Sequence, residues 1–537
     1  MLTLALLFAC SSAPEPAVEA SVPAALLPSL VIDADQSVAV IGSQIVGVGG
    51  DIDMGAMDPA IVLKADLVTS GFVDAHAHPT GLGRLQSELQ LADSPSYADT
   101  LQRIRDHKAE GWVTGRGWDQ NDWADAPQGK WPLAKDLDAI HPETPVALRR
   151  IDGHAVWVNT AVLKLAGITD DTPDPEGGRI IRDGDGHATG VLVDNAGDLV
   201  DRPESTDAEL ELWVRKGMQG SAAAGLTGVH MMGCSDRTLA IYERLGNAGE
   251  VPIRLWIYVN PGSEAAAKLG TTGPWTAGSN VKIVGVKAYI DGALGSRGAL
   301  LRQEYSDEAG QLGNRISTTD ELVAIGLPLV AQGAQLAVHA IGDGGVHDTL
   351  NAFEKLRAEP SDVRLRVEHA QVVSPEDFPR FKALNVVASM QPTHGTSDMP
   401  WAEQRVGAER IKGAYAWRTM LDSGAILAFG SDFPVEHEQP ALGMWSATTR
   451  ADADGKPAGG WYPGQLLTQD EAVAAFTVGA AMAVHEEDRL GLMQEGRVAD
   501  LTLWNLDKTP AGTRYTAVAT VVEGEVVWKA SSTTIPQ

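Results

Sequence analysis

Eight short apolar runs, separated by stretches with helical periodicity, constrain the fold of this chain more than any other feature. Runs rich in β-branched residues are typical of buried parallel strands, and their alternation with helices indicates βα units. Eight such units close a barrel. The sequence therefore predicts an α/β protein built on a (β/α)8 TIM-like barrel. The runs lie at 71–79, 226–232, 253–259, 281–290, 335–340, 364–370, 385–392 and 425–432, and helices are expected at 205–224 and 346–356, among others.

Short β-rich pieces occur at both ends of the chain, at 29–33, 37–41 and 44–48, and again at 499–504 and 519–528. They predict one small β-sandwich, assigned to residues 27–68 and 486–537, with a hairpin around Glu523-Gly524. The barrel is assigned to residues 69–485. The gap between its first and second strands includes a stretch of about 120 residues, which is too long for a structureless loop. Residues 84–204 are therefore expected to form an insert subdomain over the barrel mouth.

The first residues predict export from the cytoplasm. Residues 1–10 are apolar but too short to span a bilayer, and a flexible polar stretch follows them. Cys10 lies at the end of this run, as in bacterial lipoproteins, where such a cysteine is lipidated. Residues 1–26 are thus interpreted as a signal or lipoprotein-like segment with a linker, giving a periplasmic or membrane-anchored protein. A disordered terminus that is apolar by chance is the alternative.

Charge excludes one class of partner. The chain has 42 basic and 71 acidic residues, a formal net charge of -29, which repels nucleic acid and anionic lipid headgroups. A small-molecule substrate is expected, with membrane contact only through a lipid anchor at Cys10. The sequence sets no expectation for the oligomeric state.

Polar residues gather at the predicted strand ends, where barrel enzymes carry their active sites. His76 and His78 are two residues apart at the end of the first strand, so both rings point the same way and can reach one ion. The later strands supply Lys287, His339, His369 and Asp432. One strand-end histidine is usually a hydrogen-bonded cap, but this many together predict a metal site.

Two other local patterns have weaker chemical interpretations. Cys234, after the second strand, is a possible nucleophile, although a buried thiol is the commoner case. Residues 342–345 (GDGG) follow a strand and precede a helix as a phosphate loop would, but the full phosphate-binding pattern is missing.

The ordered set His76-x-His78, Lys287, His339, His369 and Asp432 resembles that of the amidohydrolase superfamily of metal-dependent hydrolases. Other stretches look like the amidohydrolase family 3 branch, which includes N-substituted formamide deformylase-like proteins. These stretches are residues 152–159 (DGHAVWVN), 287–297 (KAYIDGALGSR), 391–394 (QPTH), 430–436 (GSDFPVE) and 490–501 (LGLMQEGRVADL). The likeness extends from about residue 29 to about residue 530.

The resemblance implies a site for two divalent ions, and neutral imidazoles with carboxylates suit zinc. His76 and His78 would bind the more buried ion, His339 and His369 the other, and Asp432 one of the two. Lys287 would have to be carboxylated by carbon dioxide to bridge them. With an unmodified lysine, a site for a single ion is the alternative.

This resemblance also implies hydrolysis of a carbon–nitrogen bond, amide-like and not peptide, in a small molecule. A metal-activated hydroxide would attack, and Asp432 would serve as general acid and base. His154, Arg297 and His394 are candidates to bind the substrate. Ester or lactone hydrolysis, or a non-catalytic metal or ligand binder, are the alternatives.

Overall fold

The computed structural model of the chain describes residues 30–49 and 61–531, apart from residues 93, 109–110, 121–122, 124, 126–130, 151–154, 176–177, 202–203 and 359–360. The predicted export segment with Cys10, and the candidate substrate-binding residue His154, lie outside the described residues. None of the helices in the described part of the chain is long and apolar enough to cross a membrane.

Eight parallel strands form the centre of the molecule in the order β20-β19-β18-β17-β16-β14-β13-β6. Each coincides with one predicted run, so the predicted fold class is confirmed. Their side chains are almost all buried, as expected when helices cover a parallel sheet. The strands are β6 (Phe72–Ala77), β13 (Leu226–Met232), β14 (Arg254–Val259), β16 (Val281–Tyr289), β17 (Gln335–Ala340), β18 (Leu365–His369), β19 (Val386–Met390) and β20 (Ile426–Phe429), with β15 (Trp275–Ala277) added antiparallel to β16.

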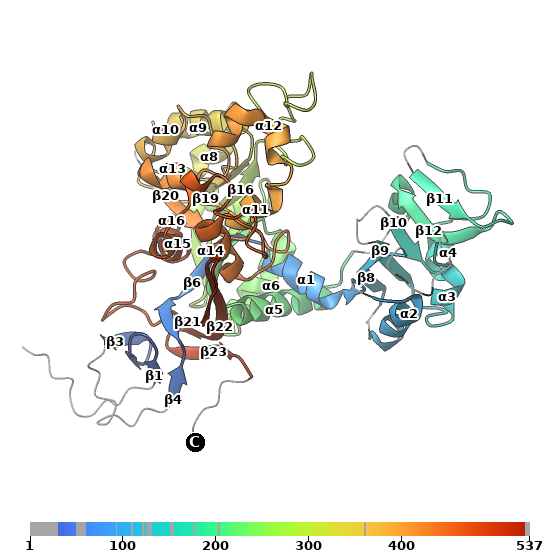
Figure 1. Ribbon diagram of the computed structural model, residues 1–537, viewed down its shortest axis with the longest axis horizontal. Coiled ribbons are helices and arrows are strands. Elements are labelled where there is room, and N and C mark those ends of the chain that lie inside the picture. The colour runs from blue at the N-terminus through green and yellow to red at the C-terminus, as the bar shows by residue number, and fades with distance from the viewer. Residues whose placement is uncertain are drawn as a thin grey trace, which may run out of the picture.

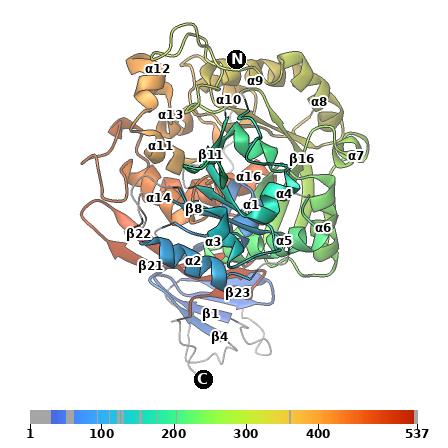
Figure 2. The same ribbon diagram turned by 90° about the vertical axis from the view of Figure 1, so that its right-hand side faces the viewer.

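Helices surround these strands in a ring (Figure 2). Capping boxes start three of them, at Thr206 with Glu209, at Thr318 with Glu321 and at Thr468 with Glu471, because side chains there satisfy the first free backbone N–H groups. The helices are α1 (Pro79–Ser87), α5 (Asp207–Ala223), α6 (Asp236–Asn247), α7 (Glu264–Thr272), α8 (Thr319–Ala331), α9 (Asp343–Leu356), α10 (Phe378–Ala383), α11 (Pro392–Asp398), α12 (Ala402–Arg410), α13 (Trp417–Asp422), α14 (Pro440–Thr449), α15 (Gln469–Phe476) and α16 (Val478–Ala483), with short 3-10 turns at Ile411–Gly413 and Pro463–Gln465.

The two ends of the chain build the predicted β-sandwich. One sheet has the order β3-β2-β1-β4 and the other β23-β22-β21-β5. Apolar side chains from both sheets, such as Ile32 and Leu503, share one core. The predicted hairpin turns at Glu523 and Gly524, whose φ angles of 52° and 79° are both positive. The strands are β1 (Leu30–Asp33), β2 (Val38–Ile41), β3 (Gln44–Val48), β4 (Ile61–Lys64), β5 (Leu67–Ser70), β21 (Leu501–Lys508), β22 (Thr513–Val522) and β23 (Glu525–Lys529).

The insert between β6 and β13 has a sheet of its own, in the order β11-β12-β10-β9-β8-β7. Trp118 and Trp157, both fully buried, lie at the centre of its core. The insert stands away from the barrel in Figure 1 and in front of it in Figure 2. Its elements are β7 (Leu89–Gln90), α2 (Tyr97–Asp106), β8 (Val113–Trp118), α3 (Ala134–Asp138), β9 (Val146–Arg150), β10 (Ala155–Val158), α4 (Thr160–Leu165), β11 (Gly178–Arg182), β12 (Ala188–Asp194) and a 3-10 turn at Asn195–Leu199.

The first and last strands of the sheet order, β6 and β20, meet through an acidic side chain. The Asp74 carboxylate accepts hydrogen bonds from the backbone N–H groups of His76 and Ser431 and from the Ser431 hydroxyl, the last at 2.6 Å. The backbone N–H of Asp432 donates to the His76 carbonyl at 2.7 Å. These contacts nearly close the barrel and hold the ends of its first and last strands together.

Helix α1, which begins directly after His78, crosses α5 at very close range. A Cβ atom on Gly217 would lie 1.9 Å from the Pro79 carbonyl oxygen, and one on Gly83 would lie 1.7 Å from the Trp213 carbonyl oxygen. Only glycine permits backbones to approach this closely. This crossing therefore fixes where the chain leaves β6, the strand that carries the predicted ligand His76.

We predict that Gly217→Ala lowers the melting temperature and reduces the free energy of unfolding by about 1–3 kcal/mol, because the new methyl group forces the helices apart. Calorimetry of the purified chain measures this. Gly184→Ala, where an added Cβ meets nothing within 4 Å, is the matched control. A rise in melting temperature, as helix propensity alone would give, would contradict the prediction.

Candidate metal centre

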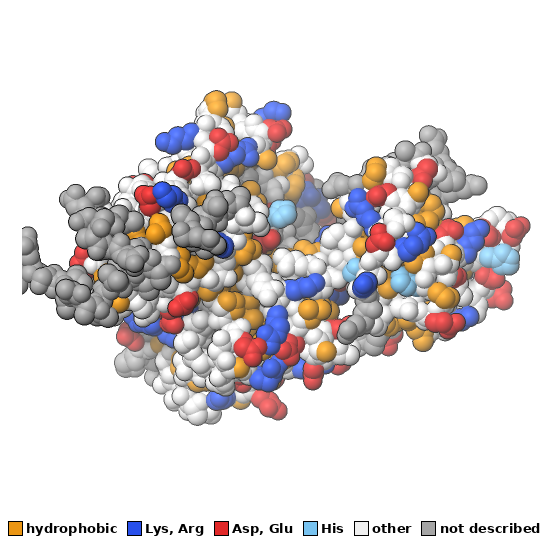
Figure 3. All heavy atoms as spheres, turned by 90° about the horizontal axis from the view of Figure 1, so that it is seen from below, with side chains coloured by type: hydrophobic (Ala, Val, Ile, Leu, Met, Phe, Trp, Pro, Cys, Tyr) orange, Lys and Arg blue, Asp and Glu red, His pale blue; other side chains and the backbone are white. Residues whose placement is uncertain are grey.

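Five elements bring the predicted ligands together. His76 lies near the end of β6, Lys287 near the end of β16, His339 near the end of β17, His369 at the end of β18 and Asp432 just after β20. Parallel strands of a barrel end on the same side, so these side chains converge. Figure 3 shows a hollow between the barrel and the insert, with a histidine side chain visible in it.

Three of these residues form a compact donor group. One ligand atom each from His76, His369 and Asp432 lies within 4.8 Å of the others, and all three residues are buried. Nε2 of His76 is 3.5 Å from Oδ1 of Asp432, and the His76 and His369 rings are 4.6 Å apart. Two imidazoles and a carboxylate suit zinc and similar divalent ions.

His78 and Lys287 lie at the edge of this group. His78 Nε2 is 3.0 Å from Asp432 Oδ1, the same oxygen that faces His76. Lys287 is almost fully buried, with Nζ 3.4 Å from His76 Nε2. Burial, its largest influence, lowers the pKa of Lys287 to about 8. This amine therefore loses its proton more readily than that of an exposed lysine.

His339 contacts the same cluster from β17. Its ring centroid is 4.5 Å from that of His369. Its Nε2 faces the Gly292 carbonyl oxygen at 3.4 Å, so that nitrogen carries the proton and Nδ1 keeps the lone pair.

The ring nitrogens of His76, His339 and His369 are suited to bind a cation because these three residues stay neutral. Burial lowers the pKa of His76 to about 4 and that of His339 to about 3, with the Lys287 charge acting in the same direction. Burial likewise holds the pKa of His369 well below its ordinary value. Burial acts to raise the pKa of Asp432, but the interactions with His76 and His78 outweigh it and hold that pKa below its ordinary value. At neutral pH the site thus offers imidazole lone pairs and a carboxylate.

Hydrogen bonds fix the tautomers of two of these histidines. A carboxylate only accepts, so the 2.7 Å contact between His76 Nδ1 and Glu368 Oε2 places the proton on Nδ1. His369 Nδ1 donates to Gln391 Oε1 at 2.8 Å, while the amide group of Gln391 donates to the Ser389 carbonyl. In both rings Nε2 keeps its lone pair, as metal binding requires.

Glu368 is itself held by a buried arginine that sequence reasoning missed. The Arg366 guanidinium donates to Glu368 at 2.8 Å, to His230 Nδ1 at 2.8 Å and to the Tyr258 hydroxyl at 3.0 Å. Burial acts to raise the pKa of Glu368, but the charge of Arg366 and the His76 hydrogen bond outweigh it and lower that pKa. In the sequence, the one indication of this pair is that two charged residues, Arg366 and Glu368, lie inside an otherwise apolar predicted strand.

The predicted substrate-binding residues fall in different places. His394 lies on α11 with its Nε2 3.9 Å from Asp432 Oδ2, so it joins the cluster. Arg297 lies on the loop after β16 and pairs with Asp307 at 3.0 Å and Glu308 at 3.1 Å. Its role as a substrate-binding residue stays a prediction, as does that of His154.

The structure argues against the nucleophile and phosphate-loop interpretations of Cys234 and residues 342–345. Cys234 is buried, and burial raises the pKa of its thiol above its ordinary value, which opposes a nucleophilic role. Within residues 342–345, the backbone N–H of Gly342 donates to the Asp291 carboxylate at 2.8 Å, and those of Gly344 and Gly345 donate to the Leu300 carbonyl at 3.0 and 3.1 Å. The donors that a phosphate would need are therefore already used.

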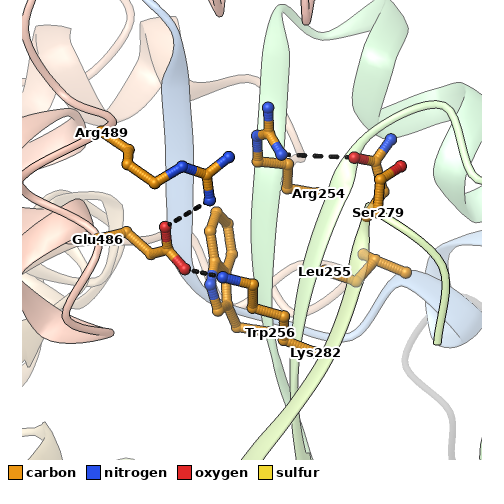
Figure 4. Close-up of a pocket in the computed structure, with 8 residues that line it drawn as sticks. Arg254, Leu255, Trp256, Ser279, Lys282, Glu486 and Arg489 are labelled. Carbon is orange, nitrogen blue, oxygen red and sulfur yellow. Dashed lines mark hydrogen bonds and ion pairs between the residues drawn. The ribbon is translucent and has the colours of Figure 1, made fainter. Parts of the chain in front are cut away.

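A small pocket occurs far from the metal centre, where the barrel strands begin (Figure 4). Lys282 and Arg489 both pair with Glu486 there, the latter at 3.0 Å. The Lys282–Glu486 pair attaches the segment after α16 to the start of β16. We assign the pocket a structural role.

The barrel and its strand-end donor group define a metal-dependent hydrolase of the amidohydrolase superfamily. The family model described as Amidohydrolase family (Amidohydro_3) matches residues 61–528, and the chain belongs to that family.

Three similar proteins span most of the chain. YtcJ of Bacillus subtilis (strain 168), provisionally named an amidohydrolase, is 32% identical over 491 residues, covering 88% of this chain and 90% of its own. N-substituted formamide deformylase of Arthrobacter pascens is 26% identical over 500 residues, covering 88% of this chain and 90% of its own. The crystal structure of an uncharacterized metal-dependent hydrolase from Pyrococcus furiosus is similar with a TM-score of 0.72 and 26% identity, covering 88% of this chain and 97% of that one.

We predict that Glu368→Gln weakens the affinity for a divalent ion about 10–100-fold, because the neutral amide holds the His76 tautomer less firmly. Competition titration against a chelator measures the affinity. Glu376→Gln, which removes a charge paired with Arg302 at the surface, should leave the affinity unchanged. Equal affinities for the two variants would show that Glu368 does not support metal binding by His76.

Proposed function

We propose that the chain hydrolyses a carbon–nitrogen bond, amide-like and not peptide, in a small molecule. The observation that carries this proposal is Asp432, whose carboxylate lies against His76 and His78 at the barrel's catalytic end. The similarity to an enzyme named N-substituted formamide deformylase supports an amide as the bond cleaved.

Residues His76, His78, His339, His369 and Asp432 would hold the metal, with zinc favoured by their nitrogen and oxygen donors. The bound ion would supply an activated water and polarise the carbonyl group of the substrate. The fixed tautomers of His76 and His369 fit this role, since both rings direct Nε2 and its lone pair away from their acceptors.

Asp432 is suited to move the proton. Its lowered pKa keeps it ionised at neutral pH, so it can accept a proton as water attacks and then deliver it to the leaving nitrogen. An amine leaves far more readily when protonated. The residue has a left-handed φ of 62°, and the hydrogen bond from its backbone to His76 holds it there. Backbone strain of this kind occurs at functional sites.

We extend the proposal to a carboxylated Lys287 and hence to two ions. Carbon dioxide adds to a neutral amine, forming a nitrogen–carbon bond and releasing one proton, and leaves an anionic carbamate. The pKa of about 8 and the position of Nζ beside His76 support this. With an unmodified lysine, the compact group of His76, His369 and Asp432 serves one ion.

We also propose a partly apolar substrate and a location outside the cytoplasm. An apolar or aromatic portion of the substrate could contact Tyr289, the last residue of β16, and Val435, on the loop after β20, both of which are exposed. Export of the protein, with acylation at Cys10, is supported by the apolar run at 1–10.

The proposal is tested with metal-loaded protein and a panel of N-formyl, N-acyl and cyclic amides, with esters and lactones beside them. We predict that Asp432→Asn lowers kcat for the best amide about 10²–10⁴-fold, because the proton carrier is lost. His78→Ala should also weaken metal binding. His187→Ala, an exposed histidine paired with Asp170 in the insert, is the control and should keep full activity.

Other outcomes would redirect the proposal. Turnover of esters or lactones alone would assign the reaction to that class. Metal binding without turnover of any compound in the panel would favour a non-catalytic binder. Full amide turnover by both Asp432→Asn and His78→Ala would overturn the proposal.

We predict that metal-stripped protein regains full activity only when metal and bicarbonate are supplied together, because the carbamate must form again. Native mass spectrometry should show the added carbon dioxide and two ions in the wild type, and neither the adduct nor the second ion in Lys287→Ala. Full recovery in buffer freed of carbon dioxide would contradict the two-ion arrangement.

A further inference from the structure

His394 lies in the metal centre, but its Nε2 differs from that of the ligands His76 and His369: it carries a proton where theirs carries a lone pair. It is 8% exposed, and its ring is nearly parallel to that of His369, at 17° and 6.0 Å. Its Nε2 has no hydrogen-bond partner among the residues that the structure describes. The same nitrogen faces Asp432 Oδ2 at 3.9 Å. A buried polar atom aimed at the site's carboxylate requires an explanation.

The tautomer of His394 is determined by the side chain behind it. Gln371 Nε2, an amide donor, faces His394 Nδ1 at 3.4 Å, so Nδ1 accepts and the proton lies on Nε2. In His76 and His369 the contacting side chains are acceptors, and the proton lies on Nδ1. His394 thus offers an N–H group where these two offer lone pairs.

The orientation of Gln371 is fixed in turn. Its Nε2 also faces Asp398 Oδ2 at 3.5 Å, and that oxygen accepts a hydrogen bond from the Tyr415 hydroxyl at 2.7 Å. Burial raises the pKa of Tyr415 well above its ordinary value, so this hydroxyl stays a donor. A carboxylate that accepts from both sides keeps the amide nitrogen of Gln371 directed toward His394.

The two carboxylate oxygens of Asp432 face different histidines. Oδ1 is close to Nε2 of both His76 and His78, while Oδ2 faces His394. Once His76 and His78 direct their lone pairs to an ion, neither ring can donate to Asp432 from that nitrogen. His394 is the neighbouring ring that still carries a proton on the facing atom.

We propose that His394 is a positioning residue for Asp432, an Nε2–H donor to Oδ2 whose tautomer is set by Gln371, Asp398 and Tyr415, and is not a metal ligand. This rests on the proposed function, in which Asp432 moves the proton. The donor holds one oxygen of the carboxylate, so that the group keeps a single orientation during the reaction. Closing the 3.9 Å gap needs a shift of about 1 Å, to the length of an ordinary hydrogen bond.

The first test compares His394→Ala and His394→Gln with Ser397→Ala, a control on the same helix whose hydroxyl bonds to Glu436 and to the backbone carbonyl of His394 but not to its ring. We predict that all three bind the same amount of metal as the wild type. His394→Ala should lower kcat for the best amide about 100-fold with little change in KM, while His394→Gln, which keeps an N–H donor, recovers part of it. Loss of bound metal in His394→Ala, or kcat within threefold of the wild type, would overturn the proposal.

The second test does not depend on turnover. In metal-free protein labelled with ¹⁵N-histidine, long-range ¹H–¹⁵N spectra report which ring nitrogen carries the proton, and His394→Ala assigns the signal. We expect the Nε2–H form in the wild type and a mixture in Gln371→Leu. An Nδ1–H form in the wild type would overturn the proposal. Absence of amide turnover by the wild type would instead refute the proposed function and leave this measurement to decide the tautomer.

Discussion

The architecture depends on the junction where the first barrel strand meets the last. Asp74 on β6 accepts three hydrogen bonds from His76 and Ser431, and a Cβ on Gly430 would lie 2.5 Å from the His76 backbone nitrogen. The carboxylate and the close backbone approach bring His76 and Asp432 together, although more than 350 residues separate them. Burial raises the pKa of Asp74 to about 7, so this junction holds a carboxyl group at a cost in solvation that its three donors offset in part.

Burial then gives the centre its chemistry. Burial lowers the pKa values of His76, His339 and His369 and makes Lys287 easier to deprotonate. Asp432 and Glu368 stay ionised because cationic or hydrogen-bonding groups surround them. In each of three rings, the hydrogen-bond partner of Nδ1 determines whether Nε2 carries a lone pair or a proton. Acceptors behind His76 and His369 leave lone pairs on Nε2, and a donor behind His394 leaves a proton there. Three chemically identical side chains thereby receive two different functions.

Much of this was predictable from local sequence. The barrel strands match the predicted runs within a few residues, because eight buried parallel strands need continuous apolar stretches that few other elements require. His76 and His78 were identifiable because alternation along a strand fixes their common direction. The start of α9 was misplaced, since Gly344 and Gly345 look like a loop in sequence but fit helically against Leu300 and Asp291. Glu368 and Arg366 were missed because nothing local shows that their partners lie on other strands.

The sequence by itself determined the fold class, the strand ends and which residue types are present there, because these depend on periodicity and on neighbours along the chain. Only the tertiary structure decided how those residues act. The tautomers of His76, His369 and His394 and the enclosure of Lys287 all depend on contacts between segments distant in sequence. Desolvation and hydrogen-bond direction are properties of the packed site and not of any single stretch, which is the physical reason for this division.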